Sequence, residues 1–136
     1  MQGFQNRIAN VLLQDDGRHA TFVEPITYIA KDGRVFVIPR GATTDGASTP
    51  PEIWPFLPPF GSYWLPSALH DCAYQNTLLL VNPQGTGQNK AALTKDDSDL
   101  LYKEAMESCG VDANTIEKIY FGVHDFAWRA FNEDRS

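Results

Sequence analysis

The sequence has few of the residues on which several classes of small protein depend. Only two of its 136 residues are cysteine, and lysine plus arginine number 11 against 17 for aspartate plus glutamate. Two cysteines are too few for a disulfide scaffold or a four-cysteine zinc site. The net charge of −6 argues against binding to a nucleic-acid backbone, because such binding requires a basic surface. We therefore expect no nucleic-acid partner.

Long apolar runs are also missing. No segment approaches the roughly 18 apolar residues that a membrane-spanning helix needs, so we expect no transmembrane segment. Residues 1–10 lack the apolar core of a signal peptide, and we expect none. Hydrophobic residues nevertheless make up 43% of the chain, which is enough for one core. The sequence thus predicts a single domain over residues 1–136.

The N-terminal part of the chain has the composition of strands. Residues 26–29 and 35–38 are rich in β-branched and aromatic side chains, and Gly33 between them suits a hairpin turn. We expect a β-hairpin or small antiparallel sheet within a β-rich region, 18–40. Seven of the nine prolines then fall between residues 39 and 66, which predicts an irregular, apolar loop over 41–65.

The C-terminal part, 66–132, has helical periodicity and helix-end signals. The three expected helices run from Pro66 to about Thr77, from a cap at Thr94 to Gly110, and from a capping box at Asn114 and Glu117 to about Phe131. A polar segment, 82–90, is expected to be a mobile loop. The predicted fold class is therefore α+β: a small antiparallel sheet, a proline-rich apolar loop and three helices.

The first expected helix carries the most informative group of polar residues. His70 and Tyr74 lie one helical turn apart on one face, and Asp71 is at the edge of that face. An imidazole can take up a proton near neutral pH, a carboxylate can hold a cation, and a phenol can orient a third group. A solvated His–Asp pair on a helix surface is the alternative interpretation.

A carboxylate on the next expected helix can complete this group. Asp99 lies beyond the capping turn, and it shares a helix face with Tyr102 and Met106. An acid on a half-apolar face needs a partner, and a histidine on a neighbouring helix would supply one. A carboxylate that orients a histidine is the usual device of general-base catalysis. The alternative is a plain surface aspartate.

The proline-rich loop supplies a second set of candidates. Asp45 and Ser48 lie in the Thr-Thr-Asp-Gly-Ala-Ser-Thr-Pro segment, where short polar side chains can contact a ligand. Trp64, near the end of the loop, is a third candidate for ligand binding. A tight turn with internal hydrogen bonds is the competing interpretation of this segment.

These motifs, in this order, resemble a family of small phage and prophage proteins of unknown function. The resemblance covers about residues 20–125. The residues that carry it are the 44–50 loop, the Pro58 to Gly61 turn, His70, Asp71 and Tyr74, then Asp99, and the Gly110–Val111 pair. The resemblance implies a phage protein located in the host cytoplasm or in the virion, with other phage proteins as partners.

The histidine helix by itself is similar to that of phospholipases A2. That resemblance implies His70 as the base that activates water, Asp71 as a Ca²⁺ ligand, and Tyr74 and Asp99 as the pair that orients the histidine. The glycine- and cysteine-rich calcium loop of those enzymes is absent here, so the remaining ligands would come from residues 45–46 or 60–61.

Three hypotheses of function follow. The first is a phage-encoded hydrolase with a His70/Asp99 dyad and an Asp71-bound cation, acting on a lipid ester. The second is a non-catalytic virion, tail or assembly protein that docks through its apolar loop, 53–64. The third is a small-ligand binder that acts in the host through the same residues without turnover.

Overall fold

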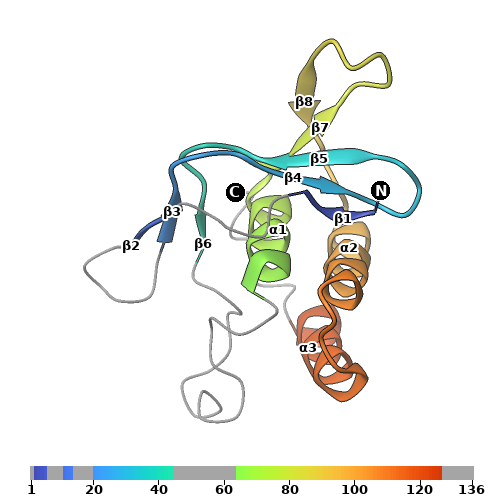
Figure 1. Cartoon of the computed structure of the whole chain (residues 1–136). Helices are drawn as coiled ribbons and strands as arrows, with labels where there is room; N and C mark the ends of the chain where they lie inside the picture. The colour runs from blue at the N-terminus through green and yellow to red at the C-terminus, as the bar shows by residue number, and fades with distance from the viewer. Residues whose placement is uncertain (1, 6–10, 14–19, 45–63, 127–136) are drawn as a thin grey trace.

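The computed structural model describes residues 2–5, 11–13, 20–44 and 64–126, and in these ranges the chain forms two antiparallel sheets and three helices (Figure 1). The larger sheet has the strand order β1-β4-β5-β7-β8 and the smaller one β2-β3-β6. The strands are β1 (Gly3–Phe4), β2 (Val11–Leu13), β3 (Ala20–Phe22), β4 (Ile26–Ile29), β5 (Val35–Ile38), β6 (Thr43–Thr44), β7 (Leu79–Val81) and β8 (Gln88–Lys90). The expected α+β class is confirmed.

The three helices follow the first six strands along the chain. They are α1 (Trp64–Gln75), α2 (Lys95–Ser108) and α3 (Ala113–Phe126). Helices α1 and α2 lie side by side on one face of the larger sheet, α1 against β5 and α2 against β1 (Figure 1). Helix α3 packs on α2. The contact between α1 and α2 brings together the polar residues of both helices.

The predicted β-hairpin is confirmed as β4 and β5. Its register pairs Ile26 with Ile38 and Tyr28 with Phe36. These four side chains are buried on the face that α1 and α2 cover, and the alternation along β4 places Thr27 on the opposite face. Gly33 in the turn has φ +91°, a conformation that glycine adopts without steric cost.

One hydrophobic core joins the larger sheet to α1 and α2. Each large side chain buried there contributes roughly 1.5–3 kcal/mol to stability. Its fully or nearly fully buried members come from strands and from both helices: Phe22, Ile26, Tyr28, Phe36, Ile38, Ala68, Leu69, Cys72, Leu78 and Ala105. A second, smaller cluster, formed by Tyr102, Met106, Val111, Ile116 and Ile119, fastens α3 to α2. The core therefore fixes how far apart α1 and α2 lie.

Helix α1 begins two residues earlier than the sequence suggests. Pro66 was expected at its start, but the helix begins at Trp64. Proline is tolerated there because the N–H groups of the first turn have no intrahelical carbonyl acceptor, so a residue without an N–H loses no hydrogen bond. The helix ends where Asn76 adopts a left-handed φ of 58°. Asparagine thus takes the place of the usual C-terminal glycine.

Helix α2 has the N-terminal cap that the sequence predicts. The Thr94 Oγ1 accepts a hydrogen bond of 3.1 Å from the backbone N–H of Asp97. Asp96 and Asp97 lie in the first turn, where the helix dipole favours negative charge. The helix ends before Gly110, whose φ of 75° is left-handed.

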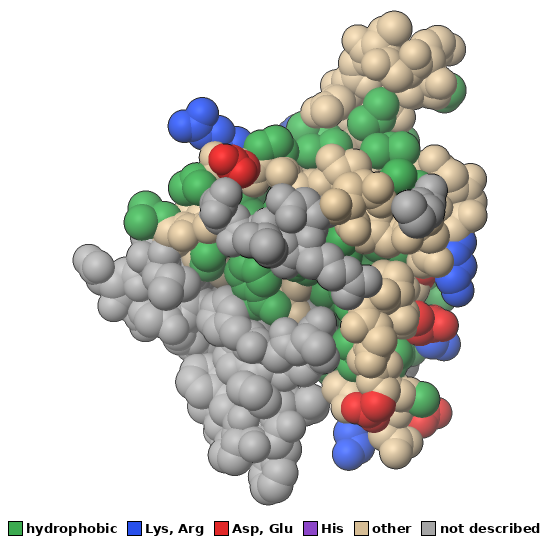
Figure 2. All heavy atoms as spheres, viewed as in Figure 1, with side chains coloured by type: hydrophobic (Ala, Val, Ile, Leu, Met, Phe, Trp, Pro, Cys, Tyr) green, Lys and Arg blue, Asp and Glu red, His purple; other side chains and the backbone are tan. Residues whose placement is uncertain are grey.

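Other sequence-based expectations are also wrong: β6 lies inside the segment 41–65 that was expected to be irregular, and two further element limits differ. Residues 82–90 were expected to form a loop, but the last three of them form β8, which pairs with β7 as a hairpin with Leu80 opposite Asn89. This hairpin rises from the sheet on the side away from the helices (Figure 1), and the surface around its tip is formed mainly by backbone and uncharged polar atoms (Figure 2). Helix α3 begins at Ala113 with Asp112 as its cap, not at Asn114, because the Asp112 Oδ1 accepts from the Thr115 N–H.

The junction between β8 and α2 holds a residue in an unfavourable backbone conformation. Ala92 has φ +52°, which costs an L residue roughly 1–2 kcal/mol. Ala92→Gly should remove that cost. It should also add conformational freedom to the unfolded chain, which lowers stability by about 0.5–1 kcal/mol. We expect the free energy of unfolding in denaturant to rise by about 0.5–1 kcal/mol. Ala68→Gly, inside α1, should lower it by at least about 1 kcal/mol, because it adds backbone freedom and removes a buried methyl group. A similar loss at both positions would contradict the interpretation.

No helix in the described part of the chain is long and apolar enough to cross a membrane.

Candidate functional site

The centre of the candidate site is a hydrogen bond between α1 and α2. His70, on the side of α1 that faces α2, places its Nε2 atom 2.8 Å from Oδ1 of Asp99. His70 is 6% exposed and Asp99 is 0% exposed. The structure thus brings together the histidine and the distal aspartate that the sequence analysis paired.

Two further donors hold the Asp99 carboxylate. The Tyr74 hydroxyl donates to Oδ1 over 2.7 Å, as the spacing of Tyr74 one turn after His70 suggests. The Lys95 ammonium donates to Oδ2, also over 2.7 Å, and the residue is 2% exposed. Asp99 therefore accepts from a histidine, a tyrosine and a lysine inside the protein.

Aromatic rings enclose the imidazole of His70. The Tyr102 ring stacks on it with centroids 4.5 Å apart and planes inclined by 26°. The Tyr74 ring lies 4.1 Å from it at 47°. The Tyr102 hydroxyl is in turn 2.6 Å from Oγ of Ser67, a buried residue one turn before His70. These contacts hold the imidazole plane in one orientation.

The ionisation of Asp99 reflects two opposing effects. Burial raises the pKa of its carboxyl, since the charged form is desolvated. The hydrogen bonds from His70, Lys95 and Tyr74 favour the charged form and outweigh that effect. The pKa of Asp99 therefore lies below its usual range, and Asp99 is a carboxylate at neutral pH.

This lowered pKa predicts how stability depends on acid. The folded state stabilises the ionised form of Asp99. Its contribution to the free energy of unfolding is therefore fully present above the unfolded pKa of about 3.9. It is lost as the pH falls through the lower, folded pKa. We expect denaturant unfolding between about pH 5 and pH 2 to show a smaller loss of stability for Asp99→Asn than for the unchanged chain. The same pH slope in both would contradict the assignment.

The hydrogen-bond pattern also determines the tautomer of His70. An ionised carboxylate only accepts hydrogen bonds, so a hydrogen bond to Asp99 requires a proton on Nε2. In the neutral imidazole Nδ1 then carries the lone pair and is the atom that can accept a proton. Chemically, the arrangement is that of a general base held by an orienting acid.

Asp71 is tied to the smaller sheet. The Thr44 hydroxyl at the end of β6 donates to its Oδ2 over 2.6 Å, and the Asp71 side chain is half-buried. Asp71 thus lies beside His70 in sequence and beside the last described residue before the proline-rich loop. Thr44 was not among the candidate residues, although it belongs to the motif that contains Asp45.

The described residues do not by themselves make a calcium site. Calcium takes 6–8 oxygen ligands, several of them carboxylates. Within residues 2–5, 11–13, 20–44 and 64–126, no three histidine, cysteine or acidic side chains cluster as metal ligands would. Asp71 therefore stands as one candidate ligand, and we derive no step through a cation.

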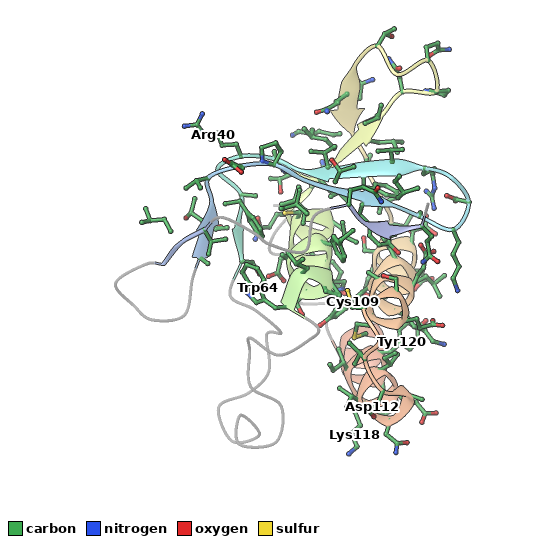
Figure 3. The ribbon with its side chains drawn as sticks, in the orientation of Figure 1. Arg40, Trp64, Cys109, Asp112, Lys118 and Tyr120 are labelled. Atoms are coloured by element: carbon green, nitrogen blue, oxygen red, sulfur yellow. The ribbon has the colours of Figure 1, made fainter. Side chains whose placement is uncertain are left out.

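The loop candidates have different outcomes. Asp45 and Ser48 lie outside the described residues, as does the apolar loop before Trp64. Trp64 lies in the first turn of α1 beside β6 (Figure 3), half-buried, with its ring stacked on Phe22 at 5.6 Å. In these contacts Trp64 packs against the core.

Lys95 is the polar residue of the site that the sequence analysis missed. Its spacing of four residues before Asp99 places both on one helix face. That spacing was the available signal, but surface helices often carry such pairs. Only burial distinguishes this one.

The cysteines form no disulfide. Cys72 is buried in the core, and burial raises the pKa of its thiol to about 12. Cys109 is half-buried.

Comparison with known proteins gives the chain a family but no activity. No curated protein and no solved structure matches it significantly. The family model described as "Protein of unknown function (DUF1353)" matches residues 20–123, which include both helices of the site. This range covers most of the chain, and it begins and ends close to the limits that the motifs suggest. The chain belongs to the DUF1353 family of proteins of unknown function.

Proposed function

We propose that this protein is a hydrolase in which His70, oriented by Asp99, removes a proton from the attacking water. The observation that carries the proposal is the buried hydrogen bond of 2.8 Å between His70 Nε2 and Asp99 Oδ1. Tyr74 and Lys95 hold the same carboxylate. The proposal includes two suggestions of the sequence motifs: that the protein comes from a phage, and that its site resembles that of phospholipases A2.

Three properties of the described residues support a base at this position. The carboxylate stabilises the imidazolium that forms when His70 takes up the proton. The enclosing rings of Tyr74 and Tyr102 limit how the imidazole can turn, so Nδ1 keeps one direction. Low exposure excludes bulk water, which strengthens each of these electrostatic interactions.

A lipid ester is the proposed substrate class. General-base attack by water on an ester carbonyl needs a positioned histidine, and the apolar chains of a lipid suit the apolar loop that precedes α1 in the sequence. Asp71 is the proposed cation ligand beside the base.

The test is hydrolysis of phospholipid vesicles and of a soluble short-chain ester by the full chain, with calcium and with a chelator. We expect release of fatty acid from the vesicles. We expect His70→Gln to lower kcat by about 10²–10⁴-fold, the usual contribution of a general base. His19→Gln is the control, because His19 belongs to neither helix of the site, and its activity should be unchanged.

The calcium arm tests Asp71 separately. If Asp71 holds the ion, chelation should lower the rate for the unchanged chain and have little further effect on Asp71→Asn. Turnover that is equal with and without chelator removes the cation from the proposal and keeps the base. Turnover in neither substrate, or equal turnover in His70→Gln, overturns the hydrolase itself.

A further inference from the structure

The buried Lys95 is not explained by the helix that carries it. It is the first residue of α2, where the helix dipole disfavours a positive charge. Its order relative to Asp99, lysine first and acid four residues later, is the less favourable one for a helical ion pair. Replacing a buried ion pair by apolar side chains is often neutral or stabilising. Local helix stability therefore gives no reason for a lysine here.

The contacts of Asp99 give that reason. Its two oxygens are divided between different partners: Oδ1 accepts from His70 and Tyr74, and Oδ2 accepts from Lys95. A buried carboxyl group without a compensating charge tends to take up a proton. A protonated Asp99 would have an O–H to donate, and the Nε2 of His70 lies within hydrogen-bond distance of it.

The consequence for His70 would be a change of tautomer. If Asp99 donates to Nε2, then Nε2 must be the acceptor and the imidazole proton moves to Nδ1. The lone pair is then held in the bond to Asp99, and Nδ1 can no longer accept a proton. A single positive charge at Oδ2 prevents this, because it keeps both carboxylate oxygens acceptors.

We infer that Lys95 is a positioning residue of the site: by holding Oδ2 of Asp99 it keeps the carboxylate an acceptor, so that His70 carries its proton on Nε2 and its lone pair on Nδ1. The charged and titratable groups of the described chain that face Asp99 are Lys95 from α2 and His70 and Tyr74 from α1. The effect of Lys95 on turnover rests on the proposed function. Its effect on the tautomer does not.

The test is ¹⁵N NMR of the histidine rings in the full chain, with the His70 signals assigned by their loss in His70→Gln. Three substitutions are compared with the unchanged protein: Lys95→Met, Lys95→Arg and Lys118→Met. Lys118 is exposed on α3 (Figure 3) and provides the same change of side chain away from the site. The unchanged chain, Lys95→Arg and Lys118→Met should show a proton on Nε2 and the lone-pair signal on Nδ1.

Lys95→Met should shift the His70 signals towards the form protonated on Nδ1. If Lys95→Met does not fold, Lys95→Gln replaces it, since glutamine is polar but uncharged, and the same shift is expected. An unchanged His70 spectrum in the folded, uncharged variant overturns the inference. So does a shift of equal size in Lys118→Met.

Kinetics on the ester substrate add a second readout. Lys95→Met should lower kcat at least tenfold with little change in KM, and Lys95→Arg should restore most of the rate. If neither the unchanged protein nor any variant hydrolyses the ester, the proposed function is overturned. The NMR result still decides the role of Lys95 in that case.

Discussion

Asp99→Asn should lower the rate of ester hydrolysis by about 10²–10⁴-fold with the fold intact. The change is nearly isosteric, so the core around it is preserved. The Lys95 ammonium can only donate, so it will hold the amide oxygen at the position of Oδ2. The amide NH₂ is then directed to His70 and donates to Nε2. That bond moves the imidazole proton to Nδ1 and removes the lone pair that accepts the proton from water.

The measurement is kcat and KM on the proposed ester substrate, together with the His70 tautomer by NMR. The loss should fall on kcat, because the base acts in the transition state. Asp96→Asn, on the exposed side of the same helix, is the control and should keep its rate. If Asp99→Asn retains the rate, Asp99 does not orient the base.

Asp99→Ala should have the largest effect on stability, lowering the free energy of unfolding by about 3–5 kcal/mol. The substitution removes the carboxylate that holds the ammonium of Lys95, a residue that is 2% exposed. It also removes the acceptor of His70 and Tyr74. A buried charge that loses its counter-charge is far more costly than a polar group that remains in water.

The matched control is Asp32→Ala. Asp32 also forms an ion pair at 2.7 Å, with Arg34, but both side chains are about half exposed. Its loss should cost no more than about 1 kcal/mol. The double variant Lys95→Met/Asp99→Ala should recover part of the stability lost in Asp99→Ala, because it removes the charge that the single variant leaves buried. Equal losses for Asp32→Ala and Asp99→Ala in denaturant titrations would show that burial does not set the cost.

Much of the candidate site follows from spacing along the chain. The one-turn separation of His70 and Tyr74 places both on one face of any helix that contains them. The position of Asp99 beyond the capping turn distinguishes it from Asp96 and Asp97, which serve the N-terminus of α2. Local periodicity was sufficient for these residues because a regular helix determines which side chains share a face.

Other features depend on contacts that spacing does not encode. Strand β8, Gln88–Lys90, was expected to belong to a loop because its residues are polar. It is a strand through its pairing with β7 at the edge of the sheet. Helix α3 begins at Ala113 because Asp112 caps it, although Asn114 has an equally good capping side chain. Backbone pairing with β7 decides the first case, and the hydrogen bond from the Thr115 N–H to the Asp112 side chain decides the second.

The sequence by itself determined the α+β class, the β4–β5 hairpin and the cap of α2, because alternation, turn residues and capping signals act within a few residues of one another. It also indicated which histidine and which acid to pair. Only the tertiary structure decided that they meet: α1 and α2 pack side by side on the sheet, and burial of their interface turns the Lys95–Asp99 pair from an ordinary helix-surface motif into the support of His70. The physical reason is that desolvation and hydrogen-bond geometry depend on what lies across the interface, which no periodicity within one helix can specify.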